Sequence, residues 1–194
     1  MNPIDPQFPP RPTALAQQLL GPLIRPGDIV IDATAGNGHD TLFLAENVGP
    51  DGRVLAFDVQ AAAIDSTRRR LVDAGMEGRV DFYQESHVGI ATRAEPQSVA
   101  AVMFNLGYLP GENHDLTTSR DDTLAALDAT AVVLKSGGAL TVVCYPGHPA
   151  GAEEALAVEK WLAARTADGW RVARFGAIGT RRPAPFLLVA GLQH

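Results

Sequence analysis

The sequence predicts an α/β protein built on a mostly parallel sheet of seven strands with helices on both faces. Short apolar runs typical of strands alternate with longer stretches of helical period, which is the pattern of repeated β-α-β units. Glycine or proline precedes several of these runs, as at Pro26-Gly27 and Asp51-Gly52, and marks the turns before them. The 194 residues fit a single domain, with residues 1–11 expected to form an extended or flexible arm.

Seven segments are predicted to be strands. Five of them alternate with helices, at residues 28–32, 53–58, 80–83, 99–104 and 139–144, and two follow the last helix, at 170–175 and 185–190. The last two are separated by only about ten residues, which is too short for the crossover that a parallel pair needs. We therefore expect an antiparallel hairpin at one edge of the sheet.

Two helices are clearly marked. The first is expected over residues 119–135, where Ser119 and Asp122 have the spacing of a capping box. The second follows Gly151. Their core-facing residues are Leu124, Leu127, Ala131 and Leu134 in the first, and Ala155, Val158 and Leu162, with Trp161 beside them, in the second. Five alternating strands followed by a hairpin outline a Rossmann-like class I methyltransferase, whose strand order is 3-2-1-4-5-7-6.

Composition and charge limit the function further. No apolar run approaches the ~20 residues that span a bilayer, so we expect a soluble, cytoplasmic protein with no membrane partner. The single cysteine, Cys144, lies in an apolar run and is expected to be a buried structural thiol. The formal net charge of −6 argues against broad, non-specific binding of nucleic acid, yet residues 160–194 carry six basic and one acidic side chain. That segment is either a solvated face or a surface for a polyanion.

A glycine-containing loop follows the first predicted strand. Gly36 and Gly38 lie between Asp32, which ends the strand, and His39, which begins a helix. Such a loop lets the backbone approach a nucleotide-like ligand at the helix N-terminus. Asp58 follows Gly38 by 20 residues, at the end of the second strand, and is placed to hold a ribose diol. These features alone suit either a nicotinamide cofactor or S-adenosylmethionine.

Two further features of the loop favour S-adenosylmethionine. Thr41 stands where a dinucleotide-binding loop has its third glycine. Asp32 and Asp40 suit the amino group and the sulfonium but would repel a pyrophosphate, at roughly 4 kcal/mol for a pair ~4 Å apart in an effective dielectric of 20. A NAD-dependent oxidoreductase is therefore the weaker alternative. Gln60, Ser86 and His87 follow the second and third strands and should reach the same crevice, with Ser86 and His87 near the adenine, although His87 also fits a partly exposed loop histidine.

Five motifs occur in one order along the chain. They are Asp32-Ala-Thr-Ala-Gly-Asn-Gly-His-Asp-Thr-Leu-Phe-Leu44, Asp58-Val-Gln60, Ser86-His87, Asn105-Leu-Gly-Tyr-Leu-Pro-Gly111 and Tyr145-Pro-Gly-His-Pro149. Together they resemble the rRNA methylase family of class I methyltransferases, whose identified members are tRNA wobble-uridine 5-aminomethyl N-methyltransferases. The resemblance runs from about residue 12 to residue 190.

The resemblance implies a cofactor, a substrate and an assembly. The methyl donor would be S-adenosylmethionine, the product S-adenosylhomocysteine, and the substrate the 5-aminomethyl group of uridine, with or without 2-thio, at position 34 of tRNA. The expected cofactor contacts are Asp32, Gly36, Asn37, Gly38, His39, Asp40, Asp58, Gln60, Ser86, His87 and Asn105. Binding of the tRNA anticodon loop and a homodimer are also implied. The chain departs from the family at Glu112-Asn113-His114 and at Arg182-Pro-Ala-Pro185, which leaves the substrate less defined than the cofactor.

The acceptor side of the site is expected at the ends of the fourth and fifth strands. We expect Asn105 to accept an N–H of the substrate amine and Tyr108 to stack on the base. Tyr145, His148 and His114 are further candidates for substrate contact, with His148 also a candidate proton acceptor. The turn around His148 also fits a purely structural role. The scattered histidines give no metal-binding pattern. Methylation of rRNA or of a small-molecule amine, and a non-catalytic S-adenosylmethionine-binding subunit, stay open as alternatives.

Overall fold

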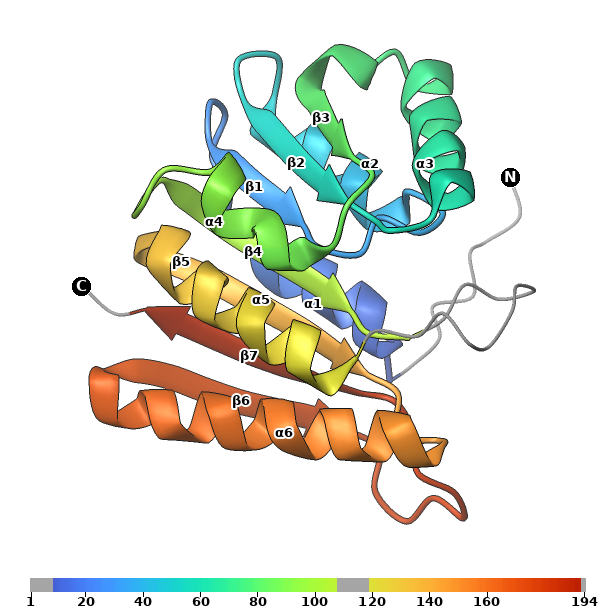
Figure 1. The fold of residues 1–194 in the computed structure, drawn as a ribbon, viewed down its shortest axis with the longest axis vertical. Helices are drawn as coiled ribbons and strands as arrows, with labels where there is room; N and C mark the ends of the chain where they lie inside the picture. The colour runs from blue at the N-terminus through green and yellow to red at the C-terminus, as the bar shows by residue number, and fades with distance from the viewer. Residues whose placement is uncertain (1–8, 108–118, 193–194) are drawn as a thin grey trace.

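Seven strands form one sheet in the part of the chain that the structure, a computed structural model, describes: residues 9–107 and 119–192 (Figure 1). Their order is β3-β2-β1-β4-β5-β7-β6, as predicted. The strands are β1 (Ile29–Asp32), β2 (Arg53–Phe57), β3 (Val80–Tyr83), β4 (Val99–Asn105), β5 (Leu134–Cys144), β6 (Trp170–Gly176) and β7 (Phe186–Leu192). The first five run parallel, and β7 is antiparallel to both β5 and β6. The predicted C-terminal hairpin is thereby confirmed.

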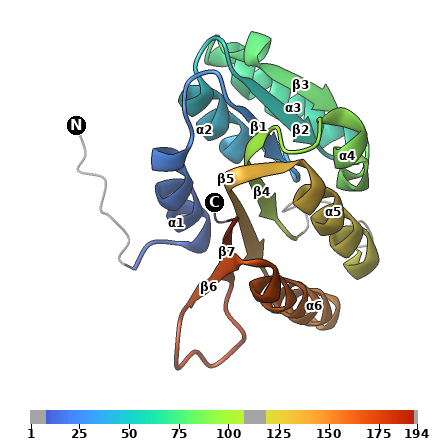
Figure 2. The same ribbon diagram turned by 90° about the vertical axis from the view of Figure 1, so that its left-hand side faces the viewer.

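Helices cover both faces of the sheet (Figure 2). One face carries α1 (Pro12–Leu20), α2 (His39–Val48) and α3 (Ala61–Asp73), and the other carries α4 (Ile90–Arg93), α5 (Arg120–Val133) and α6 (Pro149–Arg165). Successive residues of β1 point to opposite faces. Val30 packs in the cluster with Leu20 and Leu44, whereas Ile31 packs in the cluster with Leu127. The sheet therefore separates two hydrophobic cores.

The centre of the sheet contains the point where the chain changes direction. From β1 the chain proceeds outward to β2 and β3, and it then returns to β4, on the other side of β1. The first six residues of β4 are buried without alternation, as expected for a parallel strand that is covered on both faces. Ligands of such sheets bind outside the carboxyl ends of the strands at this point, which is where β1 ends at Asp32 and β4 at Asn105.

The junction of α5 and β5 corrects two predicted boundaries. The helix ends at Val133, not at residue 135, and the strand begins at Leu134, five residues before the predicted start at residue 139. Leu134 pairs with Val99 of β4, and an irregularity in that ladder, with Gly137 at φ +75°, accommodates Gly137 and Gly138 within the strand. The start of the helix is as predicted, because the Ser119 side chain accepts the Asp122 N–H at 3.1 Å.

The remaining structural predictions concern single features. Cys144 is a buried free cysteine, and burial raises the pKa of its thiol to about 12, so it is protonated at neutral pH. Trp161 packs on the core and donates its indole N–H to Asp128 at 2.8 Å. Within residues 9–107 and 119–192, no helix is both long and apolar enough to cross a membrane.

Candidate cofactor and substrate site

The loop between β1 and α2 is held in a tight conformation by its own backbone. Gly36 and Gly38 have φ values of +52° and +77°, which glycine adopts without the strain that a side chain brings. The Gly38 N–H donates to Ala35, and the Ala35 N–H donates to Phe57 at the end of β2. A Cβ on Gly38 would lie only 2.8 Å from the Cα of Thr67 in α3. Glycine is therefore required at this position by both conformation and space.

Asp58 connects this loop to the end of β2. One carboxylate oxygen accepts the Gly36 N–H and the other accepts the Gln60 N–H, both at 3.0 Å. The side chain is half-buried, so the carboxylate is fixed by two backbone donors while its edge stays open. Carboxylate oxygens accept more than one hydrogen bond each, and Asp58 thus fits the predicted ribose contact.

Asp32 and Asp40 place two carboxyl groups in one buried region. Asp32 is 1% exposed and accepts hydrogen bonds from the Thr34 N–H at 3.1 Å and the Thr41 hydroxyl at 2.6 Å. Burial, followed by the charge of Asp40, raises the pKa of Asp32 to about 7. Burial also raises the pKa of Asp40, which accepts a hydrogen bond from Gln17 at 2.7 Å. A positively charged ligand would offset the repulsion between these two carboxyl groups and would therefore be stabilised here.

Asn37 and His39 lie on the side of the loop that contacts α3. The Ser66 hydroxyl donates to the Asn37 side chain at 3.4 Å, and the Arg70 guanidinium donates to the Asn37 carbonyl at 2.6 Å. The same guanidinium lies 3.1 Å from Nε2 of His39. Both predicted contact residues are exposed, and Arg70, which the sequence did not single out, joins them to α3.

Gln60 and His87 each carry a buried acceptor that lacks a partner in the described part of the chain. His87 is 7% exposed, which excludes the partly exposed loop histidine that the sequence allowed. Its Nδ1 lies 3.1 Å from the carbonyl of Ala33, so Nδ1 carries the proton and Nε2 is the acceptor. Burial lowers the pKa of His87 and keeps the ring neutral. Among residues 9–107 and 119–192, neither Nε2 of His87 nor Oε1 of Gln60 has a hydrogen-bond partner.

Ser86, next to His87, has a local role. Its side chain accepts the Val88 N–H at 3.4 Å and begins the short helical turn after β3.

A buried acceptor without a hydrogen-bond partner, such as Oε1 of Gln60 or Nε2 of His87, costs roughly 1–3 kcal/mol. The two unpartnered atoms that follow β2 and β3 therefore suit a ligand with N–H or O–H donors, such as an adenine amino group or a ribose.

Asn105 and Tyr145 join the ends of β4 and β5. The Asn105 N–H donates to the Thr34 hydroxyl at 2.7 Å, which ties β4 to the end of β1. Burial and then the Asp40 charge raise the pKa of Tyr145, while a side-chain hydrogen bond with Asn105 lowers it. The side chains of Asn105 and Tyr145 are thus hydrogen-bonded to one another. Gly107 lies against the Tyr145 ring, since a Cβ there would be 3.5 Å from Cδ2.

His148 begins α6. Its Nδ1 accepts the Gly151 N–H at 3.1 Å, which makes His148 the N-cap of the helix. A neutral ring that accepts at Nδ1 carries its proton at Nε2 and has no second acceptor. This geometry supports the structural role that the sequence left open and opposes a role as proton acceptor. Tyr108 and His114, the other predicted acceptor-side residues, lie outside the described residues.

The predicted site residues that the structure describes lie at the carboxyl ends of the parallel strands, where the sequence placed them. The sequence did not predict several residues that support them. These are Gln17, Thr34, Thr41 and Arg70, which hold the predicted side chains in place. In the described ranges, no group of three or more histidine, cysteine, aspartate or glutamate side chains is arranged to hold a metal ion.

Comparison with known proteins gives the family. The family model described as "Putative rRNA methylase" matches residues 54–191, which is well over half of the chain. A chloroplastic tRNA (mnm(5)s(2)U34)-methyltransferase of Arabidopsis thaliana is 38% identical over 185 residues, covering 91% of this chain and 67% of the relative.

Two crystal structures share the fold over almost the whole chain. A protein of the same description from Clostridium thermocellum has a TM-score of 0.89 at 35% identity, over 93% of this chain and 97% of its own. A "putative methyltransferase" of Streptococcus mutans in complex with SAH has a TM-score of 0.83 at 31% identity, with the same coverage of 93% and 97%. This chain therefore belongs to the rRNA methylase family of class I S-adenosylmethionine-dependent methyltransferases.

Proposed function

We propose that this enzyme methylates the nitrogen of the 5-aminomethyl group on uridine, or 2-thiouridine, at wobble position 34 of tRNA. The observation that carries the proposal is the 38% identity to the Arabidopsis tRNA methyltransferase over 91% of the chain. That identity combines with a site in which Asn105 and Tyr145 meet opposite the glycine loop. A homodimer, which the family resemblance implies, belongs to the same proposal, as does the cytoplasmic location expected from the sequence.

The residues of the glycine loop and of β2 and β3 fit S-adenosylmethionine. Asp58 would hold the ribose, the unpartnered acceptors of Gln60 and His87 would meet donors of the adenosine, and Asp32 with Asp40 would favour the positive charge. When bound, this cofactor supplies an electrophilic methyl group on a sulfonium. The pyrophosphate of NAD would meet the two buried carboxyl groups and be repelled, which disfavours the oxidoreductase alternative.

The acceptor side requires positioning more than proton removal. The Asn105 side chain is hydrogen-bonded to Tyr145, and we assign its Oδ1 to the substrate amine, which would leave the amide nitrogen for the contact with Tyr145. An amine that donates one N–H to Oδ1 has its lone pair directed by the protein, and alignment of this kind accounts for large rate factors, with effective molarities near 10⁵ M or more. An aliphatic amine that arrives deprotonated needs no strong protein base.

The proposal is tested with labelled S-adenosylmethionine and three RNA substrates. These are tRNA that carries the 5-aminomethyl group, tRNA without it, and rRNA, each digested to nucleosides after incubation. Label is expected in the aminomethyl-bearing nucleoside alone. Label in rRNA would support the rRNA alternative, label only in a small-molecule amine would contradict an RNA substrate, and cofactor binding without turnover on any acceptor would indicate a non-catalytic subunit.

A further inference from the structure

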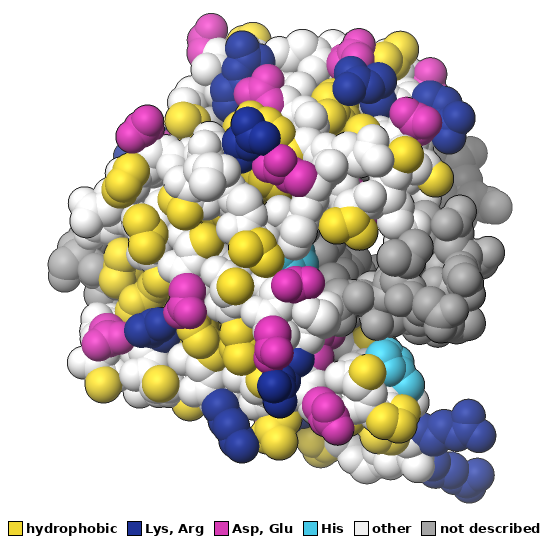
Figure 3. All heavy atoms as spheres, viewed as in Figure 1, with side chains coloured by type: hydrophobic (Ala, Val, Ile, Leu, Met, Phe, Trp, Pro, Cys, Tyr) yellow, Lys and Arg dark blue, Asp and Glu magenta, His cyan; other side chains and the backbone are white. Residues whose placement is uncertain are grey.

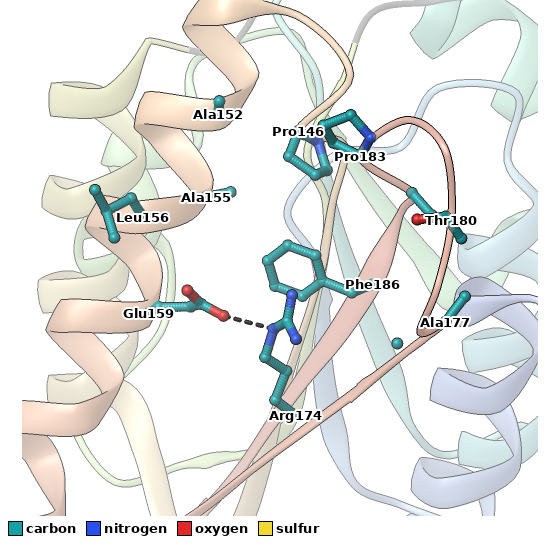
Figure 4. Close-up of a pocket in the computed structure, with 12 residues that line it drawn as sticks. Pro146, Ala152, Ala155, Leu156, Glu159, Arg174, Ala177, Thr180, Pro183 and Phe186 are labelled. Carbon is teal, nitrogen blue, oxygen red and sulfur yellow. Dashed lines mark ion pairs between the residues drawn. The ribbon is translucent and has the colours of Figure 1, made fainter.

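A cavity lies between α6 and the C-terminal hairpin, apart from the glycine loop (Figure 4). Its volume is about 320 Å³, at the lower end of the ~300–1,000 Å³ that ligand pockets occupy. Ala152 and Ala155 of α6 form one wall, and Pro183 and Phe186 of the hairpin lie opposite. The small side chains on the helix leave room for a flat group beside Phe186.

The polar part of this cavity is a fixed guanidinium. Arg174 forms an ion pair with Glu159 at 2.6 Å, and its guanidinium carbon lies 4.1 Å from the centroid of the Phe186 ring. Figure 4 shows the Arg174 side chain held between Glu159 and Phe186. Unpaired RNA bases stack on aromatic rings and on guanidinium planes of this kind. The cavity therefore has the size and the chemistry to take one nucleobase.

The loop that joins β6 to β7 is basic. Residues 169–194 contain four arginines and no aspartate or glutamate. Arg181 and Arg182 in this loop are exposed, and none of the ion pairs between described residues includes them. Basic side chains project at the lower right of Figure 3, where Figure 1 places this loop. The chain as a whole has a net charge of −6, but this loop is locally positive and would attract phosphate groups.

The cavity adjoins the candidate acceptor side through the residue that follows Tyr145. Pro146, which follows Tyr145 directly, lines the cavity together with Pro183. The carbonyl of Pro183 lies 4.0 Å from the point that a Cβ on Gly147 would occupy. A strand of RNA whose target nucleotide lies at Asn105 and Tyr145 would therefore reach this cavity with a neighbouring nucleotide.

We propose that the groove between α6 and the β6–β7 loop binds the RNA strand next to the target nucleotide. One unpaired base enters the cavity and stacks beside Arg174, while Arg181 and Arg182 contact the phosphates of that strand. The inference rests on the proposed function as a tRNA methyltransferase, and it assigns the part of the surface that recognises the substrate.

The phosphate contacts are tested with the double variant Arg181→Gln/Arg182→Gln and a control of equal charge loss in α3, Arg68→Gln/Arg69→Gln. Binding of an anticodon stem-loop is measured by fluorescence anisotropy over a range of salt concentrations. The loop variant should bind on the order of tenfold more weakly at low salt, and its salt slope should fall by about 1.4, which is 0.7 for each single-strand phosphate contact. Affinity for S-adenosylmethionine, measured by calorimetry, should stay unchanged in both variants.

The cavity is tested by filling it with Ala152→Phe, beside Ala163→Phe on an exposed position of the same helix. Ala152→Phe should raise the KM for tRNA about tenfold or more, with stem-loop binding weakened to match, while Ala163→Phe should not. If the wild type methylates tRNA but the loop variant and Ala152→Phe bind RNA like the wild type, the groove is not the RNA path and this inference alone fails. If the wild type transfers no methyl group to tRNA, the proposed function fails with it.

Discussion

The side chain of Asn105, at the end of β4, is hydrogen-bonded to that of Tyr145, the residue after β5. The backbone N–H of Asn105 is held at the same time by Thr34, after β1. The backbone and the side chain of Asn105 are thus each held by one contact at the point where the strand order reverses, and its Oδ1 is the acceptor proposed for the substrate amine.

Replacement of Asn105 by alanine should reduce turnover far more than cofactor binding. Loss of a positioning contact in the transition state is expected to lower kcat by about 10²–10⁴-fold, while the Kd for S-adenosylmethionine changes by less than about threefold. Tyr145→Phe, which removes only the hydroxyl, should reduce kcat less. Single-turnover kinetics and calorimetry measure the two effects. An equal loss of turnover and cofactor affinity in Asn105→Ala would instead assign Asn105 to the cofactor.

Replacement of Asp40 by asparagine should make the protein less sensitive to high pH. In the wild type, ionisation of buried Asp32 lowers the free energy of unfolding as the pH rises, and this decrease should be smaller in the variant. The pKa of Asp32 is about 7 in the folded chain against 3.8 unperturbed, so the folded state binds the extra proton between about pH 4 and pH 7. That stability is complete below pH 4 and is lost as the pH rises through 7. The Asp40→Asn variant has no carboxyl group to ionise at position 40, and the pKa of Asp32 is no longer raised by the charge of Asp40. Its free energy of unfolding, relative to that of the wild type, should therefore be roughly 1–3 kcal/mol higher at pH 8 than at pH 5.

Urea unfolding at both pH values measures this gain. His87 acts in the opposite direction, since burial lowers its pKa, but it is present in both proteins and cancels in the comparison. Asp65→Asn, at an exposed position in α3, is the control and should show no such difference. A stability difference for Asp40→Asn that is the same at pH 5 and pH 8 would contradict this account of the carboxyl pair.

The same substitution should weaken binding of the cationic cofactor. Removal of one carboxylate charge from this buried site is expected to cost on the order of 1–2 kcal/mol, or about 5- to 30-fold in Kd for S-adenosylmethionine at pH 8. S-adenosylhomocysteine, which has no sulfonium charge, should lose less. Calorimetric titration with both ligands compares the two losses, and equal losses would show that Asp40 does not act on the sulfonium.

Gly38→Ala should be more damaging than the matched substitution Gly27→Ala. Both glycines have positive φ values, +77° and +87°, but a Cβ on Gly38 would lie 2.8 Å from the Cα of Thr67, whereas a Cβ on Gly27 has nothing within 4 Å. Gly27→Ala should cost about 1 kcal/mol of unfolding free energy through its backbone alone, and Gly38→Ala about 2–4 kcal/mol. Equal costs in chemical denaturation would mean that contact with α3 does not shape the loop.

His148 should prove replaceable by another helix cap. His148→Ala is expected to lower the unfolding free energy by about 1 kcal/mol, and His148→Asn to restore most of it, because asparagine caps helices well. At pH 8 both variants should keep kcat within a few-fold of the wild type. A loss of 10²-fold or more in both, with folding intact, would restore His148 as a proton acceptor.

The glycine loop and the succession of strands and helices were predictable because they depend on local sequence. Alternation of apolar runs and the short link before β7 are visible along the chain, and the strand order was predictable from the class I methyltransferase outline that they resemble. The boundary at Leu134 was not, since its pairing with Val99 is a contact between distant residues. The helical period continues through Leu134, and only the partner strand ends the helix.

The supporting residues of the site were not predictable for the same reason. Gln17 donates to Asp40 across 23 residues and Thr34 accepts from Asn105 across 71, and neither residue belongs to a motif. Thr41 was noted only as the place of a missing glycine, although its hydroxyl holds Asp32. His148 was considered for proton transfer because histidine titrates near neutral pH and is not among the usual helix caps.

The most direct test of the central claim uses two anticodon stem-loops that are identical except for the 5-aminomethyl group on the wobble uridine. Each is incubated with the enzyme and S-adenosylmethionine, and the products are digested and fragmented in a mass spectrometer. The account predicts one added methyl group, on the exocyclic nitrogen of the wobble nucleoside, only in the stem-loop that carries the amine, and its loss in Asn105→Ala. A methyl group on any other atom, or equal methylation of both stem-loops, would contradict it.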